Sequence, residues 1–238
     1  YWDDVDRYVR KQFTEMQMKN GDWINEVAKN YMNTPVGPDE DGDQVSERVV
    51  GSFAGWASAN DYCANKESPI ISGCCTGNGA RALFNVWENM LEFGNETLRI
   101  HLLLNRASPW ADLNSYIPFD GKIDVVIKTS CNVEIRIPEW VKPEEVSCLV
   151  NNIPREIVIQ GRYVHVGSAE TGNVVTMKFP ISERTEKTTI GGVSYTLMIK
   201  GNDVVSIDPP GQWHPFYQRE QYRGQVRWAQ SERFVPTL

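Results

Sequence analysis

Hydrophobic residues near the start of the chain recur with the period of an α-helix. The first set has spacings of three and four residues, and a second set follows an Asn-Gly-Asp turn at 20–22. The two sets are Trp2, Val5, Val9, Phe13 and Met16, then Trp23, Val27 and Tyr31. The pattern predicts two helices within residues 1–32. Because the chain begins inside this pattern, without Met or a capping residue, we expect it to be a fragment or a processed piece.

A third helical stripe follows two adjacent cysteines. Its apolar positions are Leu83, Phe84, Trp87, Met90 and Leu91. Thr76 or Asn78 could cap the start of this helix, and Gly94 is expected to stop it. Cys74 and Cys75 would then lie on or just before the helix N-terminus, where the positive end of the helix dipole favours a thiolate.

Beyond Gly94 the periodicity changes to the two-residue alternation of β-strands. Eight short runs rich in β-branched residues are separated by turn dipeptides such as DG, NN, TG and GG. They cover residues 98–104, 122–128, 132–138, 147–150, 162–167, 173–180, 194–200 and 203–209. Strands at this spacing predict an antiparallel β-sandwich. The expected organisation is a helical part, residues 1–95, followed by a β-sandwich with a C-terminal tail, residues 96–238.

Residues 33–73 show no clear periodicity. A segment of this length is more typical of a functional loop than of a linker. It carries Phe53, Trp56 and Tyr62, whose rings could stack on a sugar or could pin the loop to the helices.

Composition and charge narrow the classes of function. The net charge is -7, the pI is about 5.1, and no Lys/Arg cluster is present, which argues against nucleic-acid binding. No apolar run reaches the roughly 18 to 20 residues of a membrane helix, and the first residues do not resemble a signal peptide. Five cysteines are an odd number and too sparse for a disulfide scaffold, so the compartment stays open.

Most cysteines, histidines and tryptophans have an ordinary structural interpretation. The side chains expected in the core are Trp87, Cys131, Trp140 and Cys148. His101 and His165 lie on predicted strands and are expected to be surface or hydrogen-bonded side chains, not ligands. The adjacent pair is different: neighbouring residues do not easily bridge to each other, so packing, separate disulfides, a metal or a nucleophile remain open.

Several motifs together resemble one enzyme family. They are "GCCTGNGAR" at 73–81 before a helix, then "VEIRIPEWV" at 133–141, "LVNN" at 149–152 and "GNVVTMKFPISER" at 172–184. This combination is similar to the C-terminal half of the β-L-arabinofuranosidases of glycoside hydrolase family 127 and their relatives. The opening "YWDDVDRYVRKQF" resembles a late helix of that family's (α/α)6 barrel. The resemblance implies an α+β chain: the end of an (α/α)6 barrel followed by an antiparallel β-sandwich.

The resemblance also implies a site. In the family a glutamate and three cysteines hold a zinc ion, and the first cysteine of the adjacent pair is the nucleophile of a retaining glycosidase. By position, Cys74 takes the role of nucleophile and Cys75 that of a zinc ligand. Asn78 and Arg81 follow within the motif and, with Trp56, are candidates for substrate binding; Arg81 could equally pair with an acid. A thiolate favoured by zinc and by a helix N-terminus can attack an anomeric carbon.

The sequence departs from the family in two respects. The family's common motif reads Cys-Cys-Pro-Pro-Asn, whereas this chain has Cys-Cys-Thr-Gly-Asn, which indicates a divergent branch. The glutamate ligand, the remaining cysteine ligand and the general acid/base of the family lie upstream of the helix that opens this chain. Cys63, with Asp61 or Glu67, could complete a zinc site within the chain, or it could be a small buried residue.

Three interpretations of function therefore stand. The first is the C-terminal portion of a zinc-thiolate glycoside hydrolase acting on L-arabinofuranoside-like sugars, incomplete as this chain, which works as a homo-oligomer or with a missing catalytic half. It predicts an exposed apolar surface on the helices. The second is a carbohydrate-binding or assembly β-sandwich without catalysis, which predicts a solvated aromatic patch on the sandwich. The third is a small structural zinc domain, which zinc removal would unfold.

Overall fold

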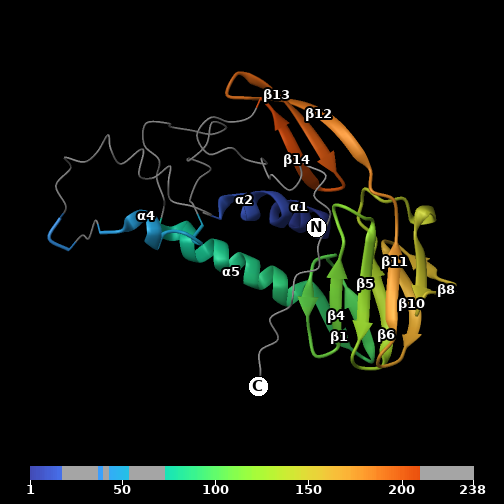
Figure 1. The fold of residues 1–238 in the computed structure, drawn as a ribbon. Helices are drawn as coiled ribbons and strands as arrows, with labels where there is room; N and C mark the ends of the chain where they lie inside the picture. The colour runs from blue at the N-terminus through green and yellow to red at the C-terminus, as the bar shows by residue number, and fades with distance from the viewer. Residues whose placement is uncertain (18–36, 40–42, 54–72, 210–238) are drawn as a thin grey trace. The chain divides into compact units, whose positions relative to one another are not determined.

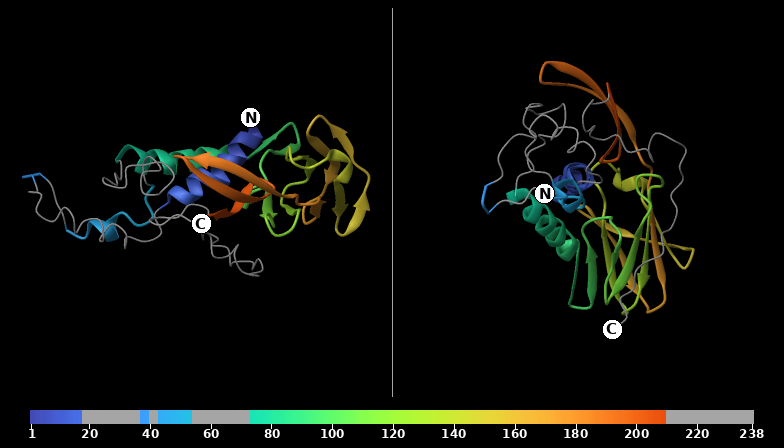
Figure 2. Two further views of the ribbon diagram at one scale, coloured as in Figure 1. Left: turned by 90° about the horizontal axis from the view of Figure 1, so that it is seen from above. Right: turned by 60° about the vertical axis from the view of Figure 1, so that its left-hand side comes forward.

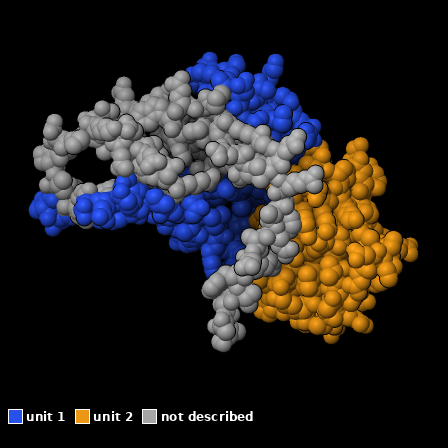
Figure 3. All heavy atoms as spheres, in the orientation of Figure 1, with its two compact units in different colours: residues 1–92, 183–218 blue, residues 93–182, 219–238 orange. Residues whose placement is uncertain are grey.

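The computed structural model describes residues 1–17, 37–39, 43–53 and 73–209. The chain divides into two compact units, coloured separately in Figure 3. One consists of Tyr1–Glu92 and Glu183–Gln218, and the other of Phe93–Ser182 and Arg219–Leu238. The division expected from the sequence, at 95/96, lies near the first of these boundaries, whereas the strands after residue 182 group with the helices.

The first unit opens with one helical segment whose pitch changes along its length. It runs through α1 (Trp2–Tyr8), a π-helical turn η1 (Val9–Phe13) and α2 (Thr14–Met16). The Thr14 hydroxyl donates a hydrogen bond to the Val9 carbonyl, five residues back, at 2.7 Å. The helical segment from Trp2 to Met16 confirms the first helix expected from the apolar spacing. The second helix, expected around Trp23, Val27 and Tyr31, lies outside the described residues.

Helix α5 (Gly73–Asn89) carries the two cysteines in its first turn, and a short helix α4 (Val45–Arg48) precedes it (Figure 1). The capping prediction was wrong, because the helix has already begun at Gly73 and both Thr76 and Asn78 lie inside it. Gly94 does not stop the helix either. It ends at Asn89, and Gly94 closes the next strand, β1 (Leu91–Gly94).

A three-stranded antiparallel sheet completes the first unit. Its order is β12 (Glu183–Ile190), β13 (Val193–Lys200) and β14 (Asp203–Asp208). The turn between β13 and β14 contacts the N-terminal helix: the Asn202 amide donates to Asp6 at 2.9 Å, and the Arg10 guanidinium lies 3.5 Å from the Asp203 carboxylate. Charged and amide groups therefore tie this sheet to residues almost two hundred positions earlier in the chain.

The second unit is a β-sandwich, as the strand spacing predicted (Figure 1, Figure 2). Its five-stranded sheet has the order β1, β2 (Thr97–Ile100), β6 (Cys131–Arg136), β10 (Tyr163–Ala169) and β9 (Val158–Gln160). Its six-stranded sheet has the order β3 (Arg106–Ala107), β4 (Ala111–Ser115), β5 (Lys122–Ile127), β11 (Val174–Lys178), β7 (Ser147–Val150) and β8 (Ile153–Arg155). Strands β2 and β6 run parallel, whereas β10 pairs antiparallel with β6 and β9, and β3–β4, β4–β5, β5–β11, β11–β7 and β7–β8 are antiparallel pairs.

Alternation of side chains builds the core of the sandwich. On β5 every second residue is buried, and β6 and β10 show the same pattern. The fully buried side chains of this core include Leu98, Ile100, Leu113, Ile123, Ile127, Ile135 and Met177. Asn151 and Asn152 both adopt positive φ angles, 51° and 66°, as the two-residue turn after β7 requires. Among the helices that the structure describes, none is long and apolar enough to cross a membrane.

Candidate functional site

The two adjacent cysteines lie together at the exposed start of α5. Their sulfur atoms are 3.5 Å apart, the Cys74 side chain is exposed and that of Cys75 is half-buried. Both residues lie in the first turn of the helix, as the sequence predicted. Both sulfurs therefore lie near the positive end of the helix dipole.

Asn78 and Arg81 extend the site along the helix. The Asn78 side-chain amide donates to the Cys74 carbonyl at 2.8 Å, and the Arg81 guanidinium donates to the Asn78 side-chain oxygen. Both side chains are exposed. These contacts make a chain of hydrogen bonds that runs from Arg81 through Asn78 to the backbone of the first cysteine. The structure thus brings together three of the residues singled out from the sequence motif.

The N-terminal part of α5 is held against Phe53. The Thr76 hydroxyl donates to the Phe53 carbonyl at 3.5 Å, and Gly79 packs directly on the Phe53 ring. A Cβ atom added at Gly79 would lie 2.5 Å from the Phe53 Cγ. Phe53 also forms a β-bridge with Gln17, whose side-chain amide donates to the Gly51 carbonyl at 3.1 Å.

Phe53 therefore pins this segment to the helices and does not offer its ring to a sugar, because it is buried. Gly79 was not recognised as a site residue from the sequence. The signal available was a second glycine within the helical motif "TGNGAR", because a residue without a side chain permits close approach of another element.

The cysteine pair has the donor chemistry for zinc. Two thiolates on a tetrahedral zinc ion, with Zn–S distances of about 2.3 Å, lie roughly 3.8 Å apart. The observed separation of 3.5 Å is close to that value. Within the described residues, no group of three or more His, Cys, Asp or Glu side chains is placed to hold a metal ion. The pair therefore fits two ligand positions of a zinc site. Cys63, the third candidate ligand, and Trp56, a candidate for substrate binding, lie outside the described residues.

The remaining cysteines and histidines have structural roles. Cys131 and Cys148 are buried in β6 and β7, and burial raises the pKa of the Cys148 thiol to about 12. His101 is buried with Nδ1 2.6 Å from the Tyr163 hydroxyl, and His165 Nδ1 lies 3.1 Å from a Glu134 carboxylate oxygen. The prediction that these residues are core or hydrogen-bonded side chains is confirmed.

The prediction for Trp87 was wrong. Its side chain is 46% exposed on α5, beside Phe84, which is 55% exposed; their ring centroids are 5.9 Å apart. The apolar stripe expected for this helix is therefore split, because Met90 and Leu91 follow the helix end at Asn89 and are buried. Trp140 is half-buried and meets the Phe179 ring edge to face.

Comparisons with known proteins give structural neighbours only. No family model matches the chain, and no curated protein does. It is similar to a β-L-arabinofuranosidase of glycoside hydrolase family 127 from Geobacillus stearothermophilus T6, with 19% identity over 57% of this chain and a TM-score of 0.41. A glycoside hydrolase matches with 14% identity over 64% of the chain and a TM-score of 0.47.

A further β-arabinofuranosidase of family 127 matches with 18% identity over 62% of the chain and a TM-score of 0.44. Two of these three neighbours belong to the family that the cysteine motif resembles. The matched regions span 24%, 30% and 28% of the lengths of the three neighbours, so the chain corresponds to less than a third of each.

Proposed function

We propose that this chain is the C-terminal portion of a retaining glycoside hydrolase that acts on L-arabinofuranoside-like sugars, with Cys74 as its nucleophile. The observation that carries the proposal is the exposed thiol of Cys74 in the first turn of α5, 3.5 Å from the Cys75 sulfur. Buried structural cysteines are inert, whereas an exposed thiol at a helix start is placed to react. The chain spans less than a third of the length of its structural neighbours. The activity and the substrate of the complete enzyme are therefore also proposed here.

The chemistry follows from the position of the sulfur. The Cys74 thiolate attacks the anomeric carbon, the bond to the leaving oxygen breaks, and a thioglycosyl bond forms with inversion. Water then attacks the same carbon and returns the thiolate, so the overall configuration is retained. A carboxylic acid must protonate the leaving oxygen and later activate the water. We propose that this general acid/base residue belongs to the part of the enzyme upstream of this chain.

Zinc is the proposed cofactor, with Cys75 and Cys74 as ligands and Cys63 as a third candidate. Bound zinc would favour the thiolate over the thiol at the two sulfurs. Asn78 and Arg81 are proposed to contact the substrate, because both are exposed beside the nucleophile. Trp56 is the proposed stacking residue of the same site.

The exposed aromatic side chains of α5 support an incomplete chain. Phe84 and Trp87 form a contiguous pair on the helix that carries the cysteines. Exposed apolar clusters of this kind on a helix usually contact another protein surface. The first interpretation from the sequence predicted such a surface, where further helices of a barrel would pack.

An activated sugar tests the nucleophile without the missing acid. A dinitrophenyl β-L-arabinofuranoside has a leaving group that needs no protonation, so this chain alone can form the thioglycosyl bond. We expect one arabinosyl adduct per chain by intact mass, located on Cys74 and absent in Cys74→Ser. The matched control is Cys131→Ser, which removes a buried thiol and should keep the adduct. Equal labelling by the α-anomer, or labelling at other residues, would refute the proposal.

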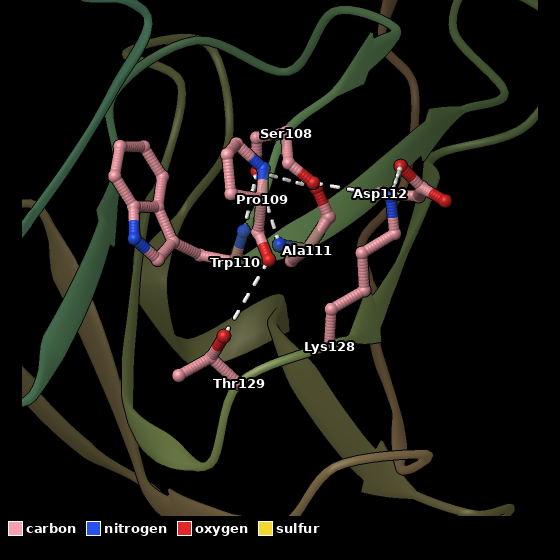
Figure 4. Close-up of polar contacts among 7 residues, drawn as sticks. All are labelled: Ser108, Pro109, Trp110, Ala111, Asp112, Lys128 and Thr129. Atoms are coloured by element: carbon pink, nitrogen blue, oxygen red, sulfur yellow. Dashed lines mark hydrogen bonds and ion pairs between the residues drawn. The ribbon is translucent and has the colours of Figure 1, made fainter. Parts of the chain in front are cut away.

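The second candidate function, a carbohydrate-binding module, has one observation in its favour. On the sandwich, Trp110 stacks on Phe93 with ring centroids 5.3 Å apart and planes within 7°, and both rings are half-buried. Figure 4 shows the Trp110 indole on the opposite side of the 108–111 turn from Lys128 and Asp112.

Hydrogen bonds hold this turn rigid. The Ser108 hydroxyl accepts from the Ala111 amide at 3.0 Å, and the Lys128 amide donates to the Trp110 carbonyl at 2.8 Å. A fixed aromatic face suits a sugar ring. Titration of arabinan oligosaccharides against the chain and Trp110→Ala, followed by tryptophan fluorescence, separates the two functions. Binding lost in Trp110→Ala, with no adduct on Cys74, would favour the module.

A further inference from the structure

The geometry of the cysteine pair has a second chemical consequence. Adjacent cysteines do not easily bridge, since the Cα atoms across a trans peptide are about 3.8 Å apart and disulfides usually span roughly 4.4–6.8 Å. Here, however, the side chains already bring the two sulfurs to 3.5 Å, so a bond between them requires mainly that the peptide between Cys74 and Cys75 reorients. A bond formed under such restraint is readily reduced, because strained disulfides are the labile ones.

The position of the pair in α5 favours ring closure. The first backbone N–H groups of a helix have no intrahelical partner, so reorienting the peptide between Cys74 and Cys75 breaks few backbone hydrogen bonds. The exposed Cys74 thiol is open to an oxidant, and Cys75 lies next to it, half-buried. Cys131 and Cys148 do not compete, because both are buried and burial raises the pKa of each thiol.

We propose that Cys74 and Cys75 form a reversible vicinal disulfide in exchange with low-molecular-weight disulfides. The Cys74 thiolate attacks one sulfur of the small disulfide and expels one small thiolate, which leaves a mixed disulfide. The Cys75 thiolate then attacks the Cys74 sulfur and expels the second small thiolate. Two electrons pass from the cysteine pair to the small disulfide, which leaves as two thiols.

Ring closure would switch off the site. It ties up the Cys74 sulfur, and it reorients the peptide whose carbonyl accepts the Asn78 hydrogen bond. The regulatory meaning rests on the proposed function, because it presumes that Cys74 is the nucleophile. The exchange reaction itself does not depend on any activity toward sugars.

Oxidised glutathione is the probe for this exchange. We incubate the reduced chain with it, quench with acid, and measure intact mass and peptide maps. The expected product has lost two hydrogens within the peptide that contains residues 74 and 75, and a reductant restores the original mass. Cys75→Ser should stop at a glutathione adduct on Cys74, since the resolving thiol is missing.

The glutathione experiment can give results that support the vicinal disulfide and results that overturn it. Cys63→Ser should still lose the two hydrogens, whereas a bridge between Cys63 and either cysteine in the unsubstituted chain would overturn the proposal. A glutathione adduct that persists on Cys74, or no reaction at the pair, would overturn it as well. If the vicinal disulfide forms but the arabinosyl adduct does not, the redox exchange is supported and the proposed function is refuted. If the arabinosyl adduct forms but the vicinal disulfide does not, only the redox exchange is refuted.

Discussion

Gly79 permits the close approach of α5 to the Phe53 ring. It is buried, and the Phe53 ring occupies the space that a side chain would need. We predict that Gly79→Ala destabilises the first unit by about 1–3 kcal/mol, the usual cost of overpacking a closed contact. Gly77→Ala is the matched control on the same helix, because no atom lies within 4 Å of its added Cβ.

At Gly77, alanine should stabilise the helix by up to about 1 kcal/mol, through its higher helix propensity. Urea unfolding followed by circular dichroism at the helix band compares both variants with the unsubstituted chain. If the two substitutions shift the midpoint in the same direction, the tight contact between Gly79 and Phe53 is not a feature of the folded protein.

Asp124 makes the stability of the sandwich depend on pH. Burial opposes its ionisation, but hydrogen bonds from Lys122, Thr176 and Tyr116 together outweigh burial, and the pKa of Asp124 lies below its ordinary value of 3.8. The unfolded chain therefore takes up the proton first as pH falls. The stabilisation is complete above pH 3.8 and is lost as pH falls through the folded pKa.

We expect Asp124→Asn to lower the free energy of unfolding by about 1 kcal/mol at pH 7, after allowance for solvent screening. The difference from the unsubstituted chain should shrink as the pH falls below 3.8. Asp112→Asn is the control, because its partner Lys128 is 42% exposed and such a pair contributes less. Urea titrations at several pH values measure both effects. A difference that stays constant down to the lowest pH would contradict the assignment.

At the scale of elements, a buried guanidinium strengthens the contact between the N-terminal helix and the β13–β14 turn, beside the hydrogen bond from Asn202 to Asp6. Arg10 lies 2.8 Å from Asp6 and 3.5 Å from Asp203, and its side chain is only 9% exposed. Arg10→Ala would leave the buried Asp203 carboxylate without this partner. We predict a loss of about 3–5 kcal/mol in the free energy of unfolding of the first unit.

Arg7→Ala is the control on the same helix. Arg7 pairs with the exposed Asp4, and exposed pairs contribute little, so we expect a change below about 1 kcal/mol. Chemical denaturation of both variants gives the comparison. If Arg10→Ala and Arg7→Ala lowered the free energy of unfolding equally, the ion pairs of Arg10 with Asp6 and Asp203 would not stabilise the β13–β14 turn.

The sequence predicted elements where burial imposes a period, and it failed where burial does not. All eight expected strands are present, and the alternation that marked β5, β6 and β10 corresponds to buried and less buried sides of these strands. Strand β12 went unrecognised, since six of its eight side chains are exposed and no apolar alternation marks it. Strand β4 alternates Ala111, Leu113 and Ser115 inward, and small or polar inward residues hide the pattern.

The same reasoning explains the limits at the candidate site. The apolar helical stripe that follows the cysteines predicted that Cys74 and Cys75 lie at a helix start, which is a local property of the chain. The contact of Gly79 with Phe53 joins residues 26 positions apart, and neither residue's local pattern encodes it. The core prediction for Trp87 failed because helical spacing shows that Phe84 and Trp87 share a face, not what covers that face.

At the scale of the whole molecule, the chain order and the spatial order differ. The first unit is built from two stretches of chain, and the sandwich sequence lies between them. We predict that each unit loses protection independently of the other. Arg10→Ala should raise amide hydrogen exchange in α1 and in β12, β13 and β14, because local opening follows the contacts that a residue makes.

Peptides from β5 and β11 should exchange at their original rates in Arg10→Ala. The reciprocal variant is Ile135→Ala, which removes a fully buried side chain from β6 and should raise exchange in β2 and β10 while leaving β12–β14 unchanged. Exchange measured by mass spectrometry on both variants separates the two units. If Arg10→Ala instead raised exchange uniformly across the sandwich, the sheet β12–β14 and the sandwich would unfold as one body. The grouping of residues 183–208 with the helices would then be wrong.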